Sequence, residues 1–348
     1  MRLGWRALQR EIRPQHSERG SGIGMPDSMG ILGVIGTMVW DTIWRQSDVR
    51  SPVEEWGGIS YALAAADAFT PGKTRVRPLI KLGSDLAEQG FRFLRDLSVV
   101  ETDEAVAVVD APNPRVELRY TGPARRAERL TGGVPAWTWE ELGPRIAGCE
   151  ALYVNFITGL EFDLEVAQQL RRGFDGPIYV DIHSLMLATG RDGERRRRSL
   201  DRWSEWLACF DVVQVNEDEL AALAAHWGDP WAFAAAAVGR ETRLLFVTLG
   251  AEGAAYVMAP DALPLEAVRA RLEGPDSVRT GKVTAEAVRG GDPTGCGDVW
   301  GMTVFRALLD GHEVEAAMRR ANAAASRSVA HRGASGLNSF LKGEIERA

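Results

Sequence analysis

A glycine-rich loop that leads directly into a helix carries the strongest chemical signal in the sequence. Residues 290–298 read GGDPTGCGD, and a long Ala-rich helix is expected from 298 to 310. Small residues at a helix start leave backbone N–H groups unhindered, and the helix dipole strengthens their attraction for an anion. Asp298 stands where a phosphate would be drawn in, so its carboxylate fits a general base that takes a proton from an attacking hydroxyl. A plain turn with Asp298 as the helix cap is the alternative, but the full Asp-Pro-Thr-Gly-x-Gly-Asp spacing favours the anion site.

Strands that alternate with helices are expected to position this loop. The first strand is expected at 30–36, with helices at 60–69 and 86–97. From residue 150 the pattern is regular, with strands at 151–157, 177–182, 211–215 and 244–249 and helices at 164–172, 200–209, 218–226, 298–310 and 313–330. Such alternation predicts an α/β fold with a mostly parallel sheet covered on both faces. Ligands bind at the carboxyl ends of the strands in such sheets, so the chemistry is expected there.

One segment departs from this alternation. Residues 105–109 read AVAVV and residues 116–120 read VELRY, with Pro-Asn-Pro at 112–114 between them. Apolar residues at a period of two on either side of a turn predict a β-hairpin with alternating faces.

The first 29 residues differ from the rest of the chain. Five arginines lie between positions 2 and 19 against two glutamates, and no apolar stretch typical of a secretion signal is present. We expect a disordered extension, or an upstream start with initiation at Met25 or Met29. The folded domain is then expected to span residues 30–340.

The composition excludes several classes of protein. The 348 residues include 41 Lys and Arg against 48 Asp and Glu, a net charge of −7 that argues against non-specific binding to nucleic acid or anionic membranes. The run Arg195–Arg198 is interpreted as solvated. Cys149, Cys209 and Cys296 have no CxxC spacing, which indicates reduced thiols in a cytosolic protein. No apolar run reaches the roughly 20 residues of a membrane span. We therefore expect a cytoplasmic protein without a nucleic-acid or membrane partner.

Several motifs together resemble one family over about Gly30 to Gly336. The segment 292–298 resembles the carboxy-terminal signature of the PfkB, or ribokinase-like, carbohydrate kinases. In the order and spacing of that family, further similar motifs are Gly36-x4-Asp41, Gly57-Gly58 before a helix, Gly83-Ser84-Asp85 with Gly90, Asn216-x-x-Glu219, Thr248-x-Gly250-x-x-Gly253, and Asn322 with Gly333-Ala334. The resemblance implies a three-layer α/β/α fold with a mostly parallel central sheet and a small β-lid, whose inserted segments would be about 38–56 and 99–132.

The resemblance also implies roles for individual residues. Asp298 would be the general base, and the N–H groups of Gly295, Cys296 and Gly297 would form the anion hole for the transferred phosphoryl group. Asn216 and Glu219 would hold Mg²⁺ through water, although an N-cap with its capping-box glutamate is the alternative. The residues implied for substrate are Asp41, Gly57 and Gly58, and those implied for nucleotide are Asn216, Glu219, Thr248, Gly250, Gly253, Thr294, Gly295, Gly297 and Asn322. A plain turn between two strands is the alternative for Thr248 to Gly253. A monovalent cation near Asp292 and Thr294, and a homodimer through the lid, are implied on the same grounds.

Three features bear on the substrate. Ala62 stands where many sugar kinases of this family carry Asn, and Asp181-Ile182-His183-Ser184-Leu185 lacks the arginine of the family's Asp-x-Asn-x-Arg pattern. His183, just after an expected strand end, is the histidine that we expect near substrate. Trp40, Trp44 and Trp56 flank the expected lid and could form an aromatic platform or simply pack there. Cys296 stands where the family more often has Ala. A position at a helix start is expected to lower the pKa of its thiol. The favoured interpretation is nevertheless a small residue that fills space, not a reactive thiol.

These observations predict an ATP-dependent, Mg²⁺-requiring kinase that phosphorylates a hydroxyl of a sugar or sugar-like small molecule. Two alternatives stay open. A nucleoside or vitamin-like kinase of the same fold is favoured if the tryptophans stack on a substrate ring. A non-catalytic ligand-binding regulatory protein is favoured by Ala62 and the missing arginine, whereas the intact loop with Asp298 argues against it.

Overall fold

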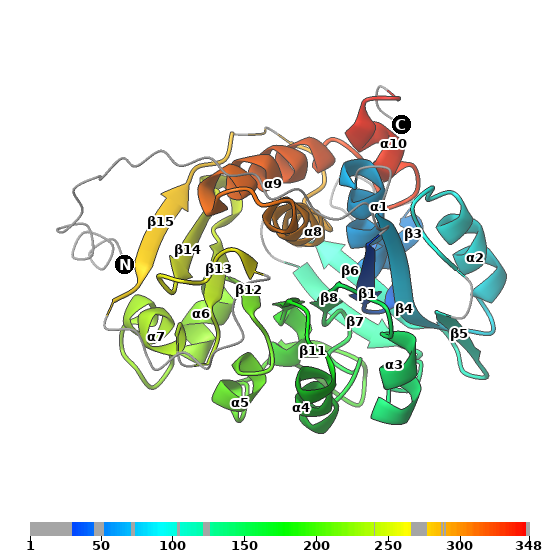
Figure 1. The fold of residues 1–348 in the computed structure, drawn as a ribbon. Helices are drawn as coiled ribbons and strands as arrows, with labels where there is room; N and C mark the ends of the chain where they lie inside the picture. Colours follow the sequence, from blue (N-terminus) through cyan, green and yellow to red (C-terminus); the bar gives the residue numbers. More distant parts are fainter. Residues whose placement is uncertain are drawn as a thin grey trace.

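A nine-stranded sheet forms the centre of the computed structural model (Figure 1). The structure describes residues 30–44, 52–70, 74–102, 105–120, 126–239, 241–265, 277–286, 288 and 290–345. The predictions for residues 1–29 therefore lie outside the described residues. Among the described residues, no helix is both long enough and apolar enough to cross a membrane.

The sheet is parallel over most of its width. Its strand order is β15 (Arg279–Val283), β14 (Ala254–Met258), β13 (Leu244–Thr248), β12 (Val212–Asn216), β9 (Ile178–Asp181), β8 (Ala151–Asn155), β1 (Ile31–Ile35), β4 (Arg75–Gly83) and β5 (Val106–Val109). The pairs from β13 to β5 are parallel, whereas β14 and β15 are antiparallel additions at one edge. The carboxyl ends of β8, β9, β12 and β13 consequently meet along one side of the sheet.

Helices cover both faces of this sheet (Figure 1). One layer holds α1 (Ile59–Phe69), α8 (Cys296–Leu309), α9 (Val314–Ser328) and α10 (Leu337–Lys342). The other layer holds α3 (Trp139–Arg145), α4 (Leu164–Gly173), α5 (Trp203–Leu207), α6 (Glu217–Leu223) and α7 (Pro230–Ala237), while α2 (Ala87–Arg95) packs beside β4. The predicted three-layer α/β/α arrangement is confirmed, with α5 shorter than expected.

Helix α8 is buried almost all round and lies close against the sheet. A Cβ at Gly301 would come within 2.6 Å of the Gln214 side chain and 2.8 Å of the Tyr153 hydroxyl. The missing side chain therefore lets the helix approach β8 and β12. This close approach brings the amino end of α8 to the carboxyl ends of the strands.

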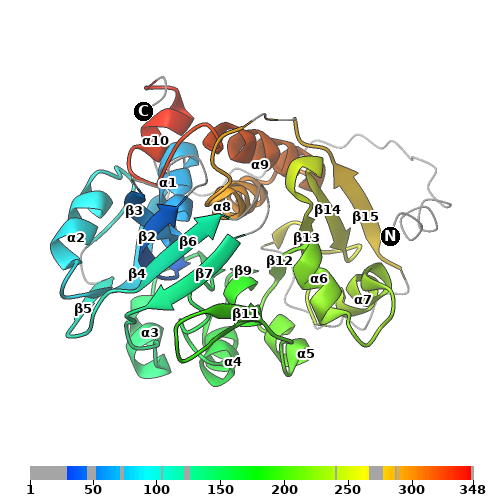
Figure 2. The same cartoon turned by 180° about the vertical axis from the view of Figure 1, so that it is seen from behind.

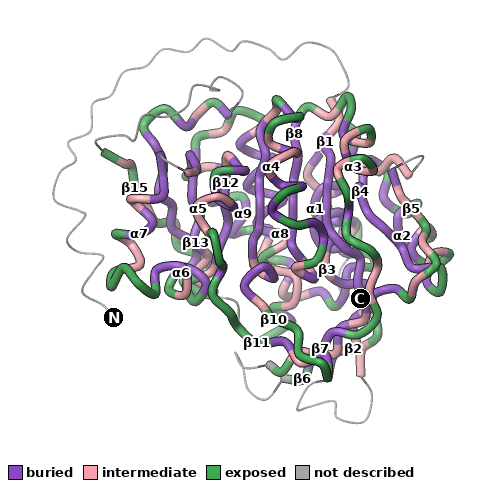
Figure 3. Tube along the Cα trace, turned by 90° about the horizontal axis from the view of Figure 1, so that it is seen from below, coloured by how far each residue is buried: buried purple, intermediate pink, exposed green. Residues whose placement is uncertain are grey.

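A second, small sheet projects from the body of the molecule (Figures 2 and 3). It consists of β3 (Val53–Gly58), β2 (Met38–Trp44), β6 (Arg115–Tyr120) and β7 (Arg126–Thr131), in that order. Its own apolar cluster contains Val39, Ile43, Val116, Leu118 and Leu130. A hairpin of β10 (Leu187–Thr189) and β11 (Arg195–Arg197) reaches this sheet, since the Leu130 N–H donates to the Gly193 carbonyl at 2.8 Å.

The expected hairpin over 105–120 was wrong. Strand β5 pairs with β4 in the large sheet, whereas β6 pairs with β2 and β7 in the small sheet. Asn113, between the two strands, is buried and binds both sheets. Its carboxamide accepts from the N–H of Gly83, at the end of β4, and donates to the carbonyl of Met38, at the start of β2. Two strands of similar alternating pattern thus belong to different sheets.

The interpretation of 195–198 as a solvated run was wrong for its first residue. The Arg195 side chain is 1% exposed and pairs with Glu128 of β7 at 2.8 Å. It also donates to the carbonyls of Ile157 and Thr158. Arg196, Arg197 and Arg198 are exposed, so the interpretation holds for the rest of the run.

The tryptophans near the small sheet pack against their surroundings. The rings of Trp40 and Trp56 meet edge to face at 5.2 Å, and the Arg119 guanidinium lies over the Trp44 ring. None of the three lines the cavity described below. Of the two interpretations, packing is the one that the structure supports.

Candidate active site

A cavity of about 220 Å³ lies between the small sheet, the carboxyl ends of the parallel strands and the amino end of α8. Ten predicted site residues line it: Asp41, Gly58, His183, Asn216, Glu219, Thr248, Thr294, Gly295, Gly297 and Asp298. The other lining residues are Val39, Tyr61, Val116, Leu118, Glu128, Asn155, Ile157, Asp181, Ser184, Gln214 and Pro293. Residues from both halves of the chain therefore meet around one space.

Asp298 lies in the first turn of α8 and is held from the sheet. The Asn155 side chain at the end of β8 donates to Asp298 Oδ1 at 2.6 Å. The donated hydrogen bond orients the carboxylate and leaves it able to accept a proton from a bound molecule. A negative charge next to helix N–H groups is also favoured by the helix dipole.

The loop before α8 turns on Gly295, which occupies the N-cap with φ 77°. Asp292 braces the loop, since its Oδ1 accepts from both the N–H and the hydroxyl of Thr294. The Cys296 N–H donates to the Pro293 carbonyl at 3.2 Å. Among the described residues, the N–H groups of Gly295 and Gly297 have no backbone acceptor, as expected at a helix start.

The expected effect of the helix start on the Cys296 thiol was wrong. Burial raises the pKa of Cys296 to about 11, and the nearby Asp292 and Asp298 charges act in the same direction. The thiol contacts Ser328 Oγ at 3.5 Å and the Ala325 carbonyl at 3.6 Å, within the packing of α8 against α9. Cys296 is therefore an inert filler at neutral pH.

Asp41 lies on the small-sheet side of the cavity. Its carboxylate packs directly over Gly57, because a Cβ there would fall 1.8 Å from Asp41 Oδ2. Gly58 follows with φ 60° and begins α1. Glu128 adds a second carboxylate from β7, oriented by the buried Arg195 guanidinium. The remaining lining of the small sheet is apolar.

A buried carboxyl, Asp181, ends β9 beneath the cavity. It accepts from the His183 N–H at 3.0 Å and from Gln214 Nε2 at 2.7 Å. Burial, together with the charges of Glu219 and Asp298, raises the pKa of Asp181 to about 7 despite a lowering by His183. The Gln214 amide also donates to the Gly297 carbonyl, so it connects this carboxyl to the helix that carries Asp298.

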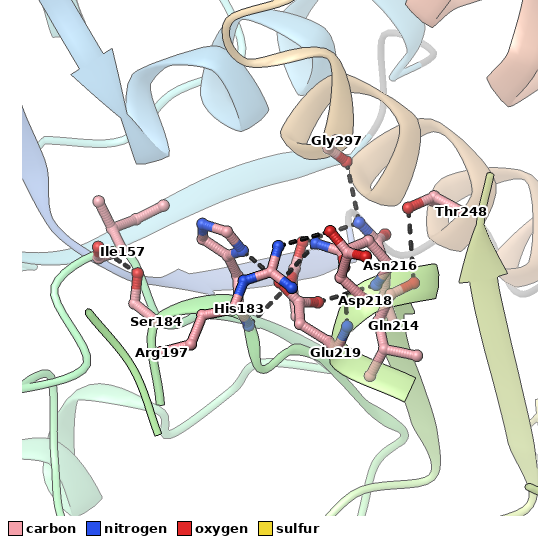
Figure 4. Close-up of polar contacts among 12 residues, drawn as sticks. Ile157, His183, Ser184, Arg197, Gln214, Asn216, Asp218, Glu219, Thr248 and Gly297 are labelled. Carbon is pink, nitrogen blue, oxygen red and sulfur yellow. Dashed lines mark hydrogen bonds and ion pairs between the residues drawn. The ribbon is translucent and has the colours of Figure 1, made fainter. Parts of the chain in front are cut away.

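Asn216 and Glu219 form a capping box at the start of α6 (Figure 4). The Glu219 N–H donates to Asn216 Oδ1 at 2.9 Å, and the Asn216 N–H donates to Glu219 Oε2 at 2.8 Å. His183 Nδ1 lies 2.5 Å from Glu219 Oε1. Burial alone would raise the pKa of Glu219, but the His183 charge and these hydrogen bonds lower it overall. The carboxylate is therefore negative and lines the cavity.

The donor set of this capping box fits Mg²⁺ that is held through water. The Asn216 carboxamide is engaged within the cap, since its NH₂ donates to Glu219 Oε1 and its Oδ1 accepts from the Glu219 N–H. A carboxylate facing the cavity can instead accept hydrogen bonds from the water that Mg²⁺ retains. No group of three or more His, Cys, Asp or Glu in the described part of the chain is arranged to hold a metal ion directly.

Three predicted nucleotide-binding residues lie apart from this cavity. Gly250 and Gly253 belong to the turn between β13 and β14 and do not line it. Asn322 is buried in α9, where it accepts from Trp300 Nε1 at 2.8 Å and donates to the Val283 carbonyl at 3.1 Å. The Ala334 N–H donates to the Trp56 carbonyl, so this segment contacts the small sheet.

Sequence reasoning missed four polar residues of the site. Asn155 and Gln214 lie within otherwise apolar strands, and a polar side chain in a buried strand is the signal that could have found them. Glu128 and Tyr61 have no such local signal. They reach the cavity only because the small sheet and α1 fold over it.

The carboxy-terminal part of the chain matches a known protein family. Residues 193–339 match the family described as pfkB family carbohydrate kinase. A comparison of the sequence with curated proteins found no match.

The fold is similar to that of several solved structures. A ribokinase from Cryptococcus neoformans var. grubii serotype A in complex with ADP is 16% identical, with a TM-score of 0.63 over 91% of this chain and 100% of that one. A nucleoside kinase from Burkholderia thailandensis in complex with inosine is 16% identical (TM-score 0.66, 90% and 97% covered). A pyrophosphate-dependent kinase in the ribokinase family, complexed with a pyrophosphate analog and myo-inositol, is 17% identical (TM-score 0.67, 90% and 99% covered).

Proposed function

We propose that this chain transfers a phosphoryl group from ATP to a hydroxyl of a sugar or sugar-like small molecule. The match of residues 193–339 to the pfkB family carbohydrate kinase model and the ribokinase-like fold support a kinase. The observation that carries the proposal is the position of Asp298. Its carboxylate lies at the amino end of α8, oriented by Asn155, and borders a cavity that also contains Asp41.

The mechanism follows from these positions. Asp41 accepts hydrogen bonds from substrate hydroxyls and orients the acceptor towards α8. Asp298 takes the proton of the acceptor hydroxyl as the hydroxyl oxygen attacks the γ-phosphorus of ATP. The new O–P bond replaces the bond from the γ-phosphorus to the β,γ-bridging oxygen, and ADP leaves. The N–H groups of Gly295 and Gly297 stabilise negative charge on the transferred phosphoryl oxygens, because they are fixed by the helix start before the reaction begins.

The donor side is proposed from the carboxyl ends of β12 and β13. Thr248 lies there beside Asn216 and Glu219. Hydrated Mg²⁺, held through water by Glu219, would neutralise charge on the donor phosphates. The family resemblance further implies a monovalent cation near Asp292 and Thr294, and a homodimer through the small sheet.

Substitution of Asp298 by Asn tests the proposal. The Asn155 amide can still donate to the remaining Oδ1, so the fold and ADP binding are expected to persist. Loss of a general base should reduce kcat by about 10²- to 10⁴-fold. The matched control is Asp201→Asn, an exposed carboxylate outside the cavity, which should leave kcat unchanged. An Asp298→Asn variant with the turnover of the control would refute the mechanism.

The substrate and donor are identified by a paired screen. Sugars, polyols and nucleosides are incubated with ATP or with pyrophosphate, and phosphorylated products are detected by mass spectrometry. A product formed from ATP supports the proposal, whereas a product formed only from pyrophosphate changes the donor. Turnover of nucleosides alone favours a nucleoside kinase. Tight binding without any product favours the non-catalytic alternative.

A further inference from the structure

Tyr61 is a cavity residue to which no role has been given. It lies in the first turn of α1, is 4% exposed and lines the cavity between the small sheet and α8. Its neighbour Ala62, which replaces the asparagine of many related sugar kinases, is fully buried and does not line the cavity. Tyr61 is the residue in the first turn of α1 that lines the cavity.

The Tyr61 ring is held in place by the loop before α8. A Cβ at Gly295 would lie 2.3 to 2.5 Å from three carbon atoms of the ring, so the ring packs face-on against the N-cap. Gly295 accommodates this contact because it has no side chain. The hydroxyl is consequently positioned by packing on a rigid helix start rather than by a hydrogen bond.

The Tyr61 hydroxyl has no hydrogen-bond partner among the described residues, although the side chain is almost completely buried. Burial raises its pKa well above the usual range, and the charges of Asp41, Asp292, Asp298 and Glu55 raise it further. The phenol thus keeps its proton and acts as a donor. The hydroxyl is not one of the fully buried unpartnered polar atoms of the described residues, so water in the cavity can accept its hydrogen bond. A bound molecule that displaces this water must supply an oxygen acceptor in its place.

The surrounding charges indicate what that molecule is. Asp41 and Asp298 act on the phenol from two sides of the cavity, and both are hydrogen-bond acceptors. A substrate held by these carboxylates must present hydroxyl groups to them. A substrate that also satisfies Tyr61 must present an oxygen acceptor next to those hydroxyls, as a polyol or a sugar does.

We propose that the Tyr61 hydroxyl donates a hydrogen bond to an oxygen of the acceptor substrate, beside the hydroxyl that is phosphorylated, and so selects polyhydroxylated substrates. The proposal rests on the proposed function and deepens it. The Tyr61 hydroxyl acts on substrate binding and contributes no proton transfer, which remains with Asp298.

Tyr61→Phe tests this assignment, because it removes the hydroxyl and keeps the ring that packs on Gly295. Tyr256→Phe is the matched control: it removes a hydroxyl bound to Glu315 on the far part of the sheet. The probes are D-ribose, myo-inositol and inosine, with phosphorylation followed by mass spectrometry and binding followed by calorimetry. For a probe that is phosphorylated, Tyr61→Phe should raise KM about tenfold, the equivalent of one neutral hydrogen bond, with kcat within about threefold and the melting temperature unchanged. Tyr256→Phe should leave KM unchanged.

Failure of this inference can be distinguished from failure of the proposed function. Equal KM in Tyr61→Phe and the wild type overturns the role of Tyr61 and leaves the kinase intact. Binding of a probe without phosphorylation refutes the kinase, yet a tenfold weaker binding to Tyr61→Phe still supports the contact. No binding of any probe to the wild type refutes both.

Discussion

The contact between Gly295 and Tyr61 predicts a specific response to a single added methyl group. In Gly295→Ala the new Cβ meets the Tyr61 ring at 2.3 to 2.5 Å, at a residue whose φ is 77°. The left-handed conformation costs an L residue about 1 to 2 kcal/mol, and overpacking of a fixed ring adds about 1 to 3 kcal/mol. The free energy of unfolding should therefore fall by about 2 to 5 kcal/mol, the sum of these two contributions.

Gly290→Ala separates the two contributions. Gly290 has φ 75°, but a Cβ there meets no atom within 4 Å. This control carries the backbone strain alone and should lose about 1 to 2 kcal/mol. Urea unfolding followed by tryptophan fluorescence measures both variants, with the slope m checked for constancy.

A double-mutant cycle isolates the steric part. In a Tyr61→Ala background the ring is gone, so Gly295→Ala should cost only the backbone strain. The double variant should then be more stable than the sum of the single changes predicts, by about 1 to 3 kcal/mol. A coupling energy of zero, or a Gly295→Ala variant as stable as Gly290→Ala, would show that the ring does not restrain the loop.

Two further predictions concern buried charges. Asp67 accepts hydrogen bonds from Lys342 and other donors. Burial alone would raise the pKa of Asp67, but these bonds lower it below its ordinary value of 3.8. Because the folded pKa lies below the unfolded one, the stabilisation is present above pH 3.8 and is lost as the pH falls through the folded value. Asp67→Asn should thus be less stable than the wild type at neutral pH, and urea titrations should show the difference shrinking in acid; a constant difference contradicts this. Arg195→Met removes the buried guanidinium that pairs with Glu128 and should cost about 3 to 5 kcal/mol. The exposed Arg196→Met should cost under about 0.5 kcal/mol, so equal melting temperatures of the two variants would contradict the buried pair.

The parts of the fold that could be predicted are those determined by local pattern. The loop at 290–298 and the helix after it depend on small residues and an acidic residue that are adjacent in the chain, and α8 begins there at Cys296. The parallel strands are likewise apparent from short apolar runs between helices. Alternating strands and helices imply parallel strands, and the carboxyl ends of parallel strands lie at the same edge of the sheet.

The parts that could not be predicted depend on contacts distant in sequence. Strands β5 and β6 have similar patterns, and only their partners, β4 and β2, decide which sheet each one joins. The burial of Arg195 requires Glu128, which lies 67 residues away. Tyr61 is held at the cavity by its contact with Gly295, a residue near the other end of the sequence. Local propensity contains no information about such pairings.

The junction between β3 and α1 has a mechanical consequence. Strand β3 ends at Gly58 and α1 begins at Ile59, so no connecting residues separate the small sheet from the helix that carries Tyr61. The two glycines of this junction are tightly enclosed: a Cβ would meet Asp41 at Gly57 and the Thr37 carbonyl at Gly58. We therefore expect a displacement of the small sheet to move α1 and the Tyr61 ring that packs on Gly295. Binding of a ligand against the small sheet would then shift the N–H groups at the start of α8.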